Sequence, residues 1–120
     1  MEIKELYAKL DGNYQEALTR LMNEALITRF VLKFKDNNGG EVVIKALESS
    51  DNNAIFESTH ALKGVAGNLA FTALFDISSR ICEKARGKAQ DEKIDFTNDL
   101  VEFKAIYSKT ISALEEFANK

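Results

Sequence analysis

The sequence predicts an all-α fold, an up-and-down antiparallel four-helix bundle with one or two additional short helices. Apolar residues recur every three or four positions along almost the whole chain, and no segment sustains an alternation of period two. Proline, the strongest helix breaker, is absent. Because amphipathic helices with short connections pack as antiparallel bundles, we expect residues 1–120 to form one helical domain.

The first half of the chain predicts helical segments separated by turn residues. Leu6, Tyr7 and Leu10 indicate a short leading helix that ends before residues 11–13, and the helical period then continues from residue 14 to residue 34. The strongest break follows at residues 36–40, Asp-Asn-Asn-Gly-Gly. Residues 42–47 predict a short helix, since their three consecutive β-branched residues are too few and too isolated for a paired strand.

The second half predicts three longer helices. Residues 49–53, Ser-Ser-Asp-Asn-Asn, end one helix and supply N-caps for the next, which we expect from about residue 52 to 69. Another helix is expected from about residue 72 to 87, with Gly87 as its C′ stop. After a polar loop, Asp95 is predicted to cap a last long helix. The apolar positions of these last two helices are Leu74, Phe75, Ile77, Ile81, Cys82 and Ala85, and then Phe96, Leu100, Phe103, Ile106, Tyr107, Ile111, Leu114 and Phe117.

Composition narrows the possible functions. The chain is 45% hydrophobic and 29% charged, and its net charge of −3 offers no basic surface for nucleic acid. No stretch approaches the roughly 18 apolar residues of a membrane span, and no secretory signal opens the chain. One cysteine rules out an internal disulfide. We therefore expect a cytoplasmic protein without a membrane role and, because no extra apolar stripe is evident, a monomer.

The single histidine, His60, is predicted to point away from the core. At about 100° per residue, the apolar side chains of its helix fall roughly 140° to 240° from the imidazole. These side chains are Ile55, Leu62, Val65, Ala66 and Leu69. They form the stripe that a bundle would bury, so the imidazole should face water.

The residues beside His60 define a second, polar face. Lys63 follows at i+3 and Gly64 at i+4, and Gly67 lies on the same side of the helix. An interior glycine costs a helix up to about 1 kcal/mol relative to alanine, so two of them indicate that something approaches this face closely. Phe56, at i−4, either offers an aromatic contact to a partner or tucks toward a neighbouring helix. The two residues that flank this face are Asn53 and Glu57.

This arrangement suits phosphoryl transfer. A neutral imidazole is a competent nucleophile near neutral pH, because the unperturbed pKa of histidine is about 6.5. The phosphoryl transition state is loose and highly charged, so it needs positioning and cations more than covalent activation. Lys63 supplies one cation, and the two glycines leave room for a second protein. No acidic cluster is arranged for Mg²⁺, which we expect on the partner.

Residues 60–69 resemble the signature of the histidine-containing phosphotransfer (HPt) domain family. That signature is approximately His-x-Leu-Lys-Gly, then small residues and Leu-Gly. The matching residues are His60, Leu62, Lys63, Gly64, Ala66, Asn68 and Leu69. The placement of the other helices is similar as well, over roughly residues 5 to 117. Two departures are Ala70, where the family usually has glycine, and Thr59, where alanine is usual.

The resemblance implies a carrier of phosphohistidine without kinase activity of its own. His60 would take a phosphoryl group from an aspartate of one receiver domain and pass it to another. Such receivers belong to response regulators and hybrid histidine kinases. Lys63 and Gly64 match the positions that steady the phosphoryl group and clear space for it. Asn53, Phe56, Glu57 and Gly67 are the candidate partner contacts.

Two other functions compete with this one. The bundle could serve only for docking, in which case partner binding would be indifferent to replacement of His60. An independent enzyme or metal site is the other alternative, but the single histidine and Cys82 fall on different helices, and a zinc site would need mostly carboxylate ligands. Cys82 falls in an apolar stripe and Ser58 faces the core side, so no nucleophilic triad follows.

Overall fold

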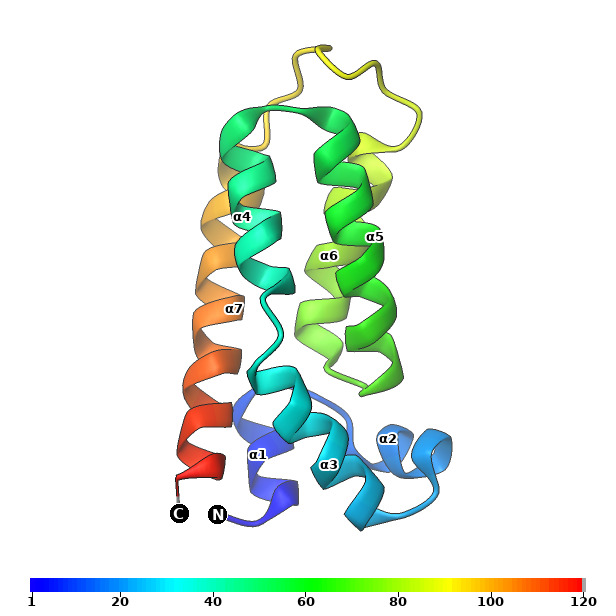
Figure 1. The fold of residues 1–120 in the computed structure, drawn as a ribbon, viewed down its shortest axis with the longest axis vertical. Helices are drawn as coiled ribbons and strands as arrows, with labels where there is room; N and C mark the ends of the chain where they lie inside the picture. Colours follow the sequence, from blue (N-terminus) through cyan, green and yellow to red (C-terminus); the bar gives the residue numbers. More distant parts are fainter. Residues whose placement is uncertain (120) are drawn as a thin grey trace.

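The computed structural model describes residues 1–119, and in that part of the chain it contains seven α-helices and no strand (Figure 1). The molecule measures 44 × 25 × 19 Å. The helices are α1 (Ile3–Lys9), α2 (Tyr14–Leu21), α3 (Glu24–Lys35), α4 (Gly39–Ser49), α5 (Asn52–Asn68), α6 (Thr72–Ala85) and α7 (Thr97–Ala118). The predicted all-α fold is confirmed.

Helices α4, α5, α6 and α7 form the antiparallel bundle, and α1, α2 and α3 gather at one end of it (Figure 1). The longest helix, α7, has 22 residues and runs alongside α4 and then past α3 and α1. Both termini lie at the end where the short helices gather, and the loop between α6 and α7 crosses the opposite end. The exposed face of α5 therefore lies along one side of the bundle.

The helical run predicted from residue 14 to 34 is divided in two. Met22 adopts a left-handed conformation with φ of 76°, which ends α2. The side chain of Asn23 then caps α3 by accepting a hydrogen bond of 2.7 Å from the backbone N–H of Leu26. The spacing of the apolar residues continues unchanged across Met22 and Asn23, so periodicity alone does not reveal that one helix ends and another begins there.

The predicted break at residues 36–40 is shorter than expected, because α4 already begins at Gly39. Gly40 lies against α7 so closely that a β-carbon there would be 2.1 Å from ring carbons of Tyr107. Gly40 therefore lets α4 and α7 approach each other closely, whereas the sequence predicted it as part of a break between helices. Tyr107 in turn donates a hydrogen bond of 3.0 Å to the carboxylate of Glu41.

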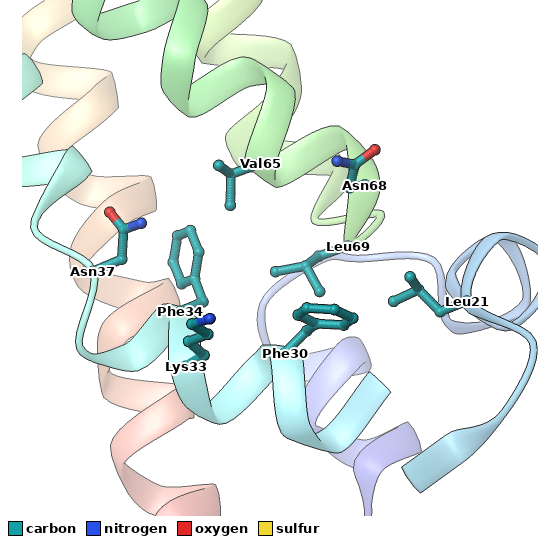
Figure 2. A pocket seen from close by; sticks show the side chains of 8 residues that line it. All are labelled: Leu21, Phe30, Lys33, Phe34, Asn37, Val65, Asn68 and Leu69. Carbon is teal, nitrogen blue, oxygen red and sulfur yellow. The ribbon is translucent and has the colours of Figure 1, made fainter. Parts of the chain in front are cut away.

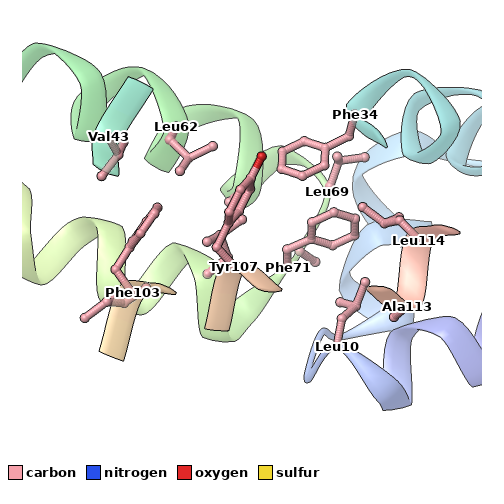
Figure 3. Packing of buried hydrophobic residues seen from close by; sticks show 14 of the residues in the cluster. Leu10, Phe34, Val43, Leu62, Leu69, Phe71, Phe103, Tyr107, Ala113 and Leu114 are labelled. Atoms are coloured by element: carbon pink, nitrogen blue, oxygen red, sulfur yellow. The ribbon is translucent and has the colours of Figure 1, made fainter. Parts of the chain in front are cut away.

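A continuous core joins the short helices to the bundle. Phe71, fully buried, makes edge-to-face contacts with Tyr7 of α1 and Phe34 of α3, with ring centroids 5.6 and 5.3 Å apart. Figure 3 shows Phe34, Phe71 and Leu69 clustered near Leu114, with Phe103 and Tyr107 further along near Val43 and Leu62. The buried residues Ile55, Leu62, Ala66 and Leu69 confirm most of the predicted core stripe of α5.

The N-terminal end of α5 is capped as predicted. The side chain of Asp51 accepts a hydrogen bond of 3.1 Å from the backbone N–H of Ala54. This bond is the main reason that the pKa of Asp51 lies below its usual range. Gln90, in the loop after α6, donates a second hydrogen bond to the same carboxylate. The start of α5 is therefore fixed to the loop beside it.

The C-terminal end of α5 closes in a Schellman motif with alanine in the position that usually holds glycine. Ala70 has a φ of 55°, and the backbone N–H groups of Ala70 and Phe71 donate to the carbonyls of Gly67 and Ala66. The hydroxyl of Tyr7, whose pKa is raised by burial, donates a hydrogen bond of 2.7 Å to the carbonyl of Leu69. The departure from the family pattern at Ala70 leaves the turn itself intact.

The ends of the last two helices differ slightly from the predictions. Gly87 has a φ of 71° just past the end of α6, as expected of a C′ glycine. Asp95 is not the N-cap of α7, because the helix begins at Thr97 with Phe96 before it. The carboxylate of Asp95 still accepts the backbone N–H of Thr97 at 2.9 Å, and hydrogen bonds from the side chain and then the backbone of Thr97 lower the pKa of Asp95.

Candidate functional site

His60 lies in the middle of the 17-residue helix α5 and is exposed. Its imidazole nitrogens have no hydrogen-bond partner among residues 1–119. The buried residues Ile55 and Leu62 occupy the opposite side of the same helix. The outward orientation that helical geometry predicted is confirmed.

The phenyl ring of Phe56 stacks against the imidazole. Their centroids are 5.7 Å apart and their planes differ by 16°. The guanidinium of Arg86, at the end of α6, lies 5.1 Å from the centroid of the same phenyl ring, and it also binds the carboxylate of Glu83 through hydrogen bonds of 2.9 to 3.1 Å. Phe56 is half-buried and packs against the core. Of its two predicted orientations, the ring adopts the one that reaches a neighbouring helix.

Lys63 lies one turn after His60 and is half-buried. Within the part of the chain that the structure describes, its ammonium group forms no ion pair or hydrogen bond. The pKa of Glu83 is lowered, chiefly by its hydrogen bonds from Arg86 and to a lesser extent by the charge of Lys63. Within the described residues, the ammonium is therefore near the α6 carboxylate without being bound to it.

The two glycines of this helix have different surroundings. A β-carbon at Gly64 would have no heavy atom within 4 Å, so the backbone beside the imidazole is open to solvent. A β-carbon at Gly67 would instead lie 3.1 Å from the ring of Phe75 on α6. The carbonyl of Gly67 also accepts a hydrogen bond from Arg20 of α2. Gly67 thus serves helix packing, and the free space predicted on this face is confined to Gly64.

The remaining predicted residues fall into two groups. Asn53 and Glu57 are exposed on the first two turns of α5. The other three residues point inward: Cys82 is fully buried, the buried hydroxyl of Thr59 donates to the carbonyl of Ile55, and the half-buried Ser58 does the same. Over residues 1–119 no three His, Cys, Asp or Glu side chains are grouped so that they could hold a metal ion.

An apolar groove lies along the other flank of α5, and the sequence did not predict it. The apolar period predicts Val65 in the core stripe, but the side chain is 36% exposed. Val65 lines two hollows together with Asn37, which lies between α3 and α4. Figure 2 shows the groove, which has a volume of about 250 Å³ and is lined by Leu21, Phe30, Lys33, Phe34, Asn37, Val65, Asn68 and Leu69. Val65 also lines a second hollow, of about 210 Å³, beside Val42.

Helix α5 thus exposes the imidazole of His60 next to the side chain of Lys63 and the open backbone of Gly64. The sequence matches the Hpt domain over residues 13–117, which is most of the chain. The chain therefore belongs to the Hpt domain family, whose members carry phosphoryl groups in phosphorelays and interact with receiver domains. Comparisons with curated proteins and with solved structures give no match. Among the described residues, no helix is long and apolar enough to cross a membrane.

Proposed function

We propose that this protein is a histidine phosphotransfer protein of a two-component phosphorelay and that His60 is its phosphoacceptor. His60 would accept the phosphoryl group from the aspartate of one receiver domain and pass it to the aspartate of another. The observation that most supports this role is the exposed imidazole, whose two nitrogens have no hydrogen-bond partner among residues 1–119, on a helix that is capped at both ends. These receivers would belong to response regulators and hybrid histidine kinases, and the protein would act as a cytoplasmic monomer.

The transfer is a displacement at phosphorus. The unprotonated ring nitrogen of His60 donates its lone pair to phosphorus, and the P–O bond to the receiver's aspartate breaks, so that the carboxylate leaves with the electron pair. The reverse displacement delivers the group to the second receiver. Because charge spreads over the phosphoryl oxygens, the ammonium of Lys63 stabilises the transition state. We assign the Mg²⁺ of the reaction to the receiver.

The open backbone at Gly64 explains how the receiver reaches the imidazole. In-line transfer requires the two reacting atoms to come within roughly 3 to 3.5 Å before the bond forms. A side chain at Gly64 would stand in the space that the receiver's acidic site must enter, whereas the existing glycine leaves it empty.

We further propose that the receiver covers the exposed face of α5 together with the apolar groove beside it. Val65 directly follows Gly64, and Phe30 lines the same groove with 38% of its surface exposed. A receiver that covers both Gly64 and this groove would remove these apolar side chains from water. Asn53 and Glu57 would form the polar rim of this interface at the start of α5.

The test is incubation with a phosphorylated receiver and Mg²⁺, followed by intact-mass measurement. We expect the wild-type chain to gain the mass of one phosphoryl group and the His60→Gln variant to gain none. Since His60 is exposed, the variant should keep the fold, which circular dichroism would verify. Label on the variant would contradict the assignment of His60. A wild-type chain that binds the receiver but accepts no phosphoryl group would establish the docking-only alternative.

A further inference from the structure

Phe56, which the sequence places either against a partner or toward a neighbouring helix, stacks on the imidazole of His60. We propose that Phe56 is a positioning residue that holds the imidazole of His60 in the orientation from which it reacts. This role rests on the proposed phosphotransfer at His60. It goes beyond that function because it identifies what fixes the nucleophile inside this chain.

An exposed histidine needs such a contact. Its side chain samples several rotamers, and reactive histidines are usually oriented by a hydrogen bond to one ring nitrogen. Within residues 1–119 neither nitrogen of His60 has a hydrogen-bond partner. The parallel ring of Phe56, with its centroid 5.7 Å from that of the imidazole, is the interaction that selects one rotamer.

The phenyl ring is itself held from the neighbouring helix. The guanidinium of Arg86 lies over it at 5.1 Å and donates hydrogen bonds to the carboxylate of Glu83, one turn earlier on α6. The ring of Phe56 also packs against the core, so it is a fixed platform rather than a free surface side chain. Phe56, Arg86 and Glu83 thus connect the orientation of His60 to the packing of α5 against α6.

The stack also suits the charge that appears on the imidazole during transfer. When the bare nitrogen bonds to phosphorus, the other nitrogen keeps its proton, so the ring becomes cationic until that proton leaves. The face of an aromatic ring attracts a cation at this range. Phe56 therefore favours both the reactive rotamer and the ring state that attack produces, and an aliphatic side chain would lack the attraction for the cationic imidazole.

Positioning and docking make different kinetic predictions. A positioning residue acts on the rate at saturating receiver, whereas a docking contact acts on the dissociation constant. The experiment therefore measures both quantities for the phosphorylated receiver with the wild type and with Phe56→Leu, Phe56→Tyr and Phe75→Leu. Phe75→Leu is the matched control, since Phe75 is another half-buried phenylalanine between α5 and α6 and faces Gly67 instead of His60. NMR of the His60 ring protons reports the stacking directly.

For Phe56→Leu we expect the saturated rate to fall roughly three- to tenfold while the dissociation constant changes by less than about twofold. The His60 ring-proton resonances should move toward values of an unstacked imidazole. Phe56→Tyr, which keeps the aromatic ring, should have a saturated rate and His60 resonances close to those of the wild type. Phe75→Leu should also leave both the rate and the resonances near wild type. A higher dissociation constant with an unchanged saturated transfer rate would overturn the positioning role in favour of docking. Equal slowing by Phe75→Leu would overturn it in favour of general loosening. A wild-type chain that accepts no phosphoryl group would instead overturn the proposed function.

Discussion

Replacing Gly64 with alanine should stabilise the protein and impair it at the same time. Gly64 lies in the interior of α5 with no unusual backbone conformation, and its missing β-carbon would meet nothing within 4 Å. The substitution therefore gains the helix propensity of alanine, about 1 kcal/mol, without a packing cost. For a domain of this size, such a gain raises the Tm by about 4 °C.

The same methyl group enters the space that the incoming receiver needs. Displacement of the reacting atoms by about 1 Å can cost up to a hundredfold in rate, so we expect phosphoryl acceptance by Gly64→Ala to slow about tenfold or more. Thermal unfolding followed by circular dichroism measures the first effect, and transfer from a phosphorylated receiver measures the second.

Gly67→Ala is the matched control for this substitution. Its β-carbon would lie 3.1 Å from the ring of Phe75, so that ring must move by a few tenths of an ångström and the gain in helix propensity is reduced. We expect a smaller rise in Tm and a smaller loss of transfer than for Gly64→Ala. A Gly64→Ala protein that accepts the phosphoryl group at the wild-type rate would refute the steric reasoning. A Gly64→Ala protein that is less stable than wild type would refute the inference that a β-carbon at this position meets no neighbouring atoms.

Three other substitutions test separate parts of the structure. Lys63→Met should slow transfer about tenfold, because one cation is lost from the transition state, while the unfolding free energy changes by less than about 0.5 kcal/mol; equal rates would exclude the role of the ammonium. Gly40→Ala should cost about 2 kcal/mol in denaturant unfolding, since its β-carbon overlaps the ring of Tyr107, and an unchanged midpoint would contradict that contact. Asp51→Ala should lower the Tm at pH 7. The deficit should shrink in acid, because the pKa of Asp51 is depressed in the folded state and its stabilisation is lost as pH falls through that pKa; a pH-independent deficit would contradict this linkage.

The outward direction of His60 could be predicted because it depends on one helix alone. The period of the apolar residues fixes which side of α5 is buried, and Asp51 fixes where the helix starts. The neighbours of His60 along the same helix follow from the same geometry. For these residues local sequence and tertiary packing agree, so the apolar periodicity was sufficient to predict which side chains are exposed.

The features that were missed depend on contacts between helices. Val65 is exposed where it lines two hollows with Asn37, between α3 and α4, and no property of α5 reveals this. The contact of Arg86 with Phe56 requires that α6 end beside the second turn of α5. The two interior glycines looked equivalent in sequence, but only Gly67 faces an aromatic ring from another helix. The side chain of Asn23 caps α3 in the structure, but the apolar period continues unchanged across it, so periodicity does not indicate that a new helix begins there.

Residues before the family match hold the turn after α5 through hydrogen bonds, so the matched range leaves out part of what holds this helix in place. The family match starts at residue 13, but the Tyr7 phenol holds the Leu69 carbonyl and the backbone of Asp11 accepts from Ala73. Trimming the chain to the matched range would leave the distal end of the histidine-bearing helix without these anchors. Fraying from that end would then reach the reactive side chain two turns away, so the first dozen residues act as a remote support for the chemistry.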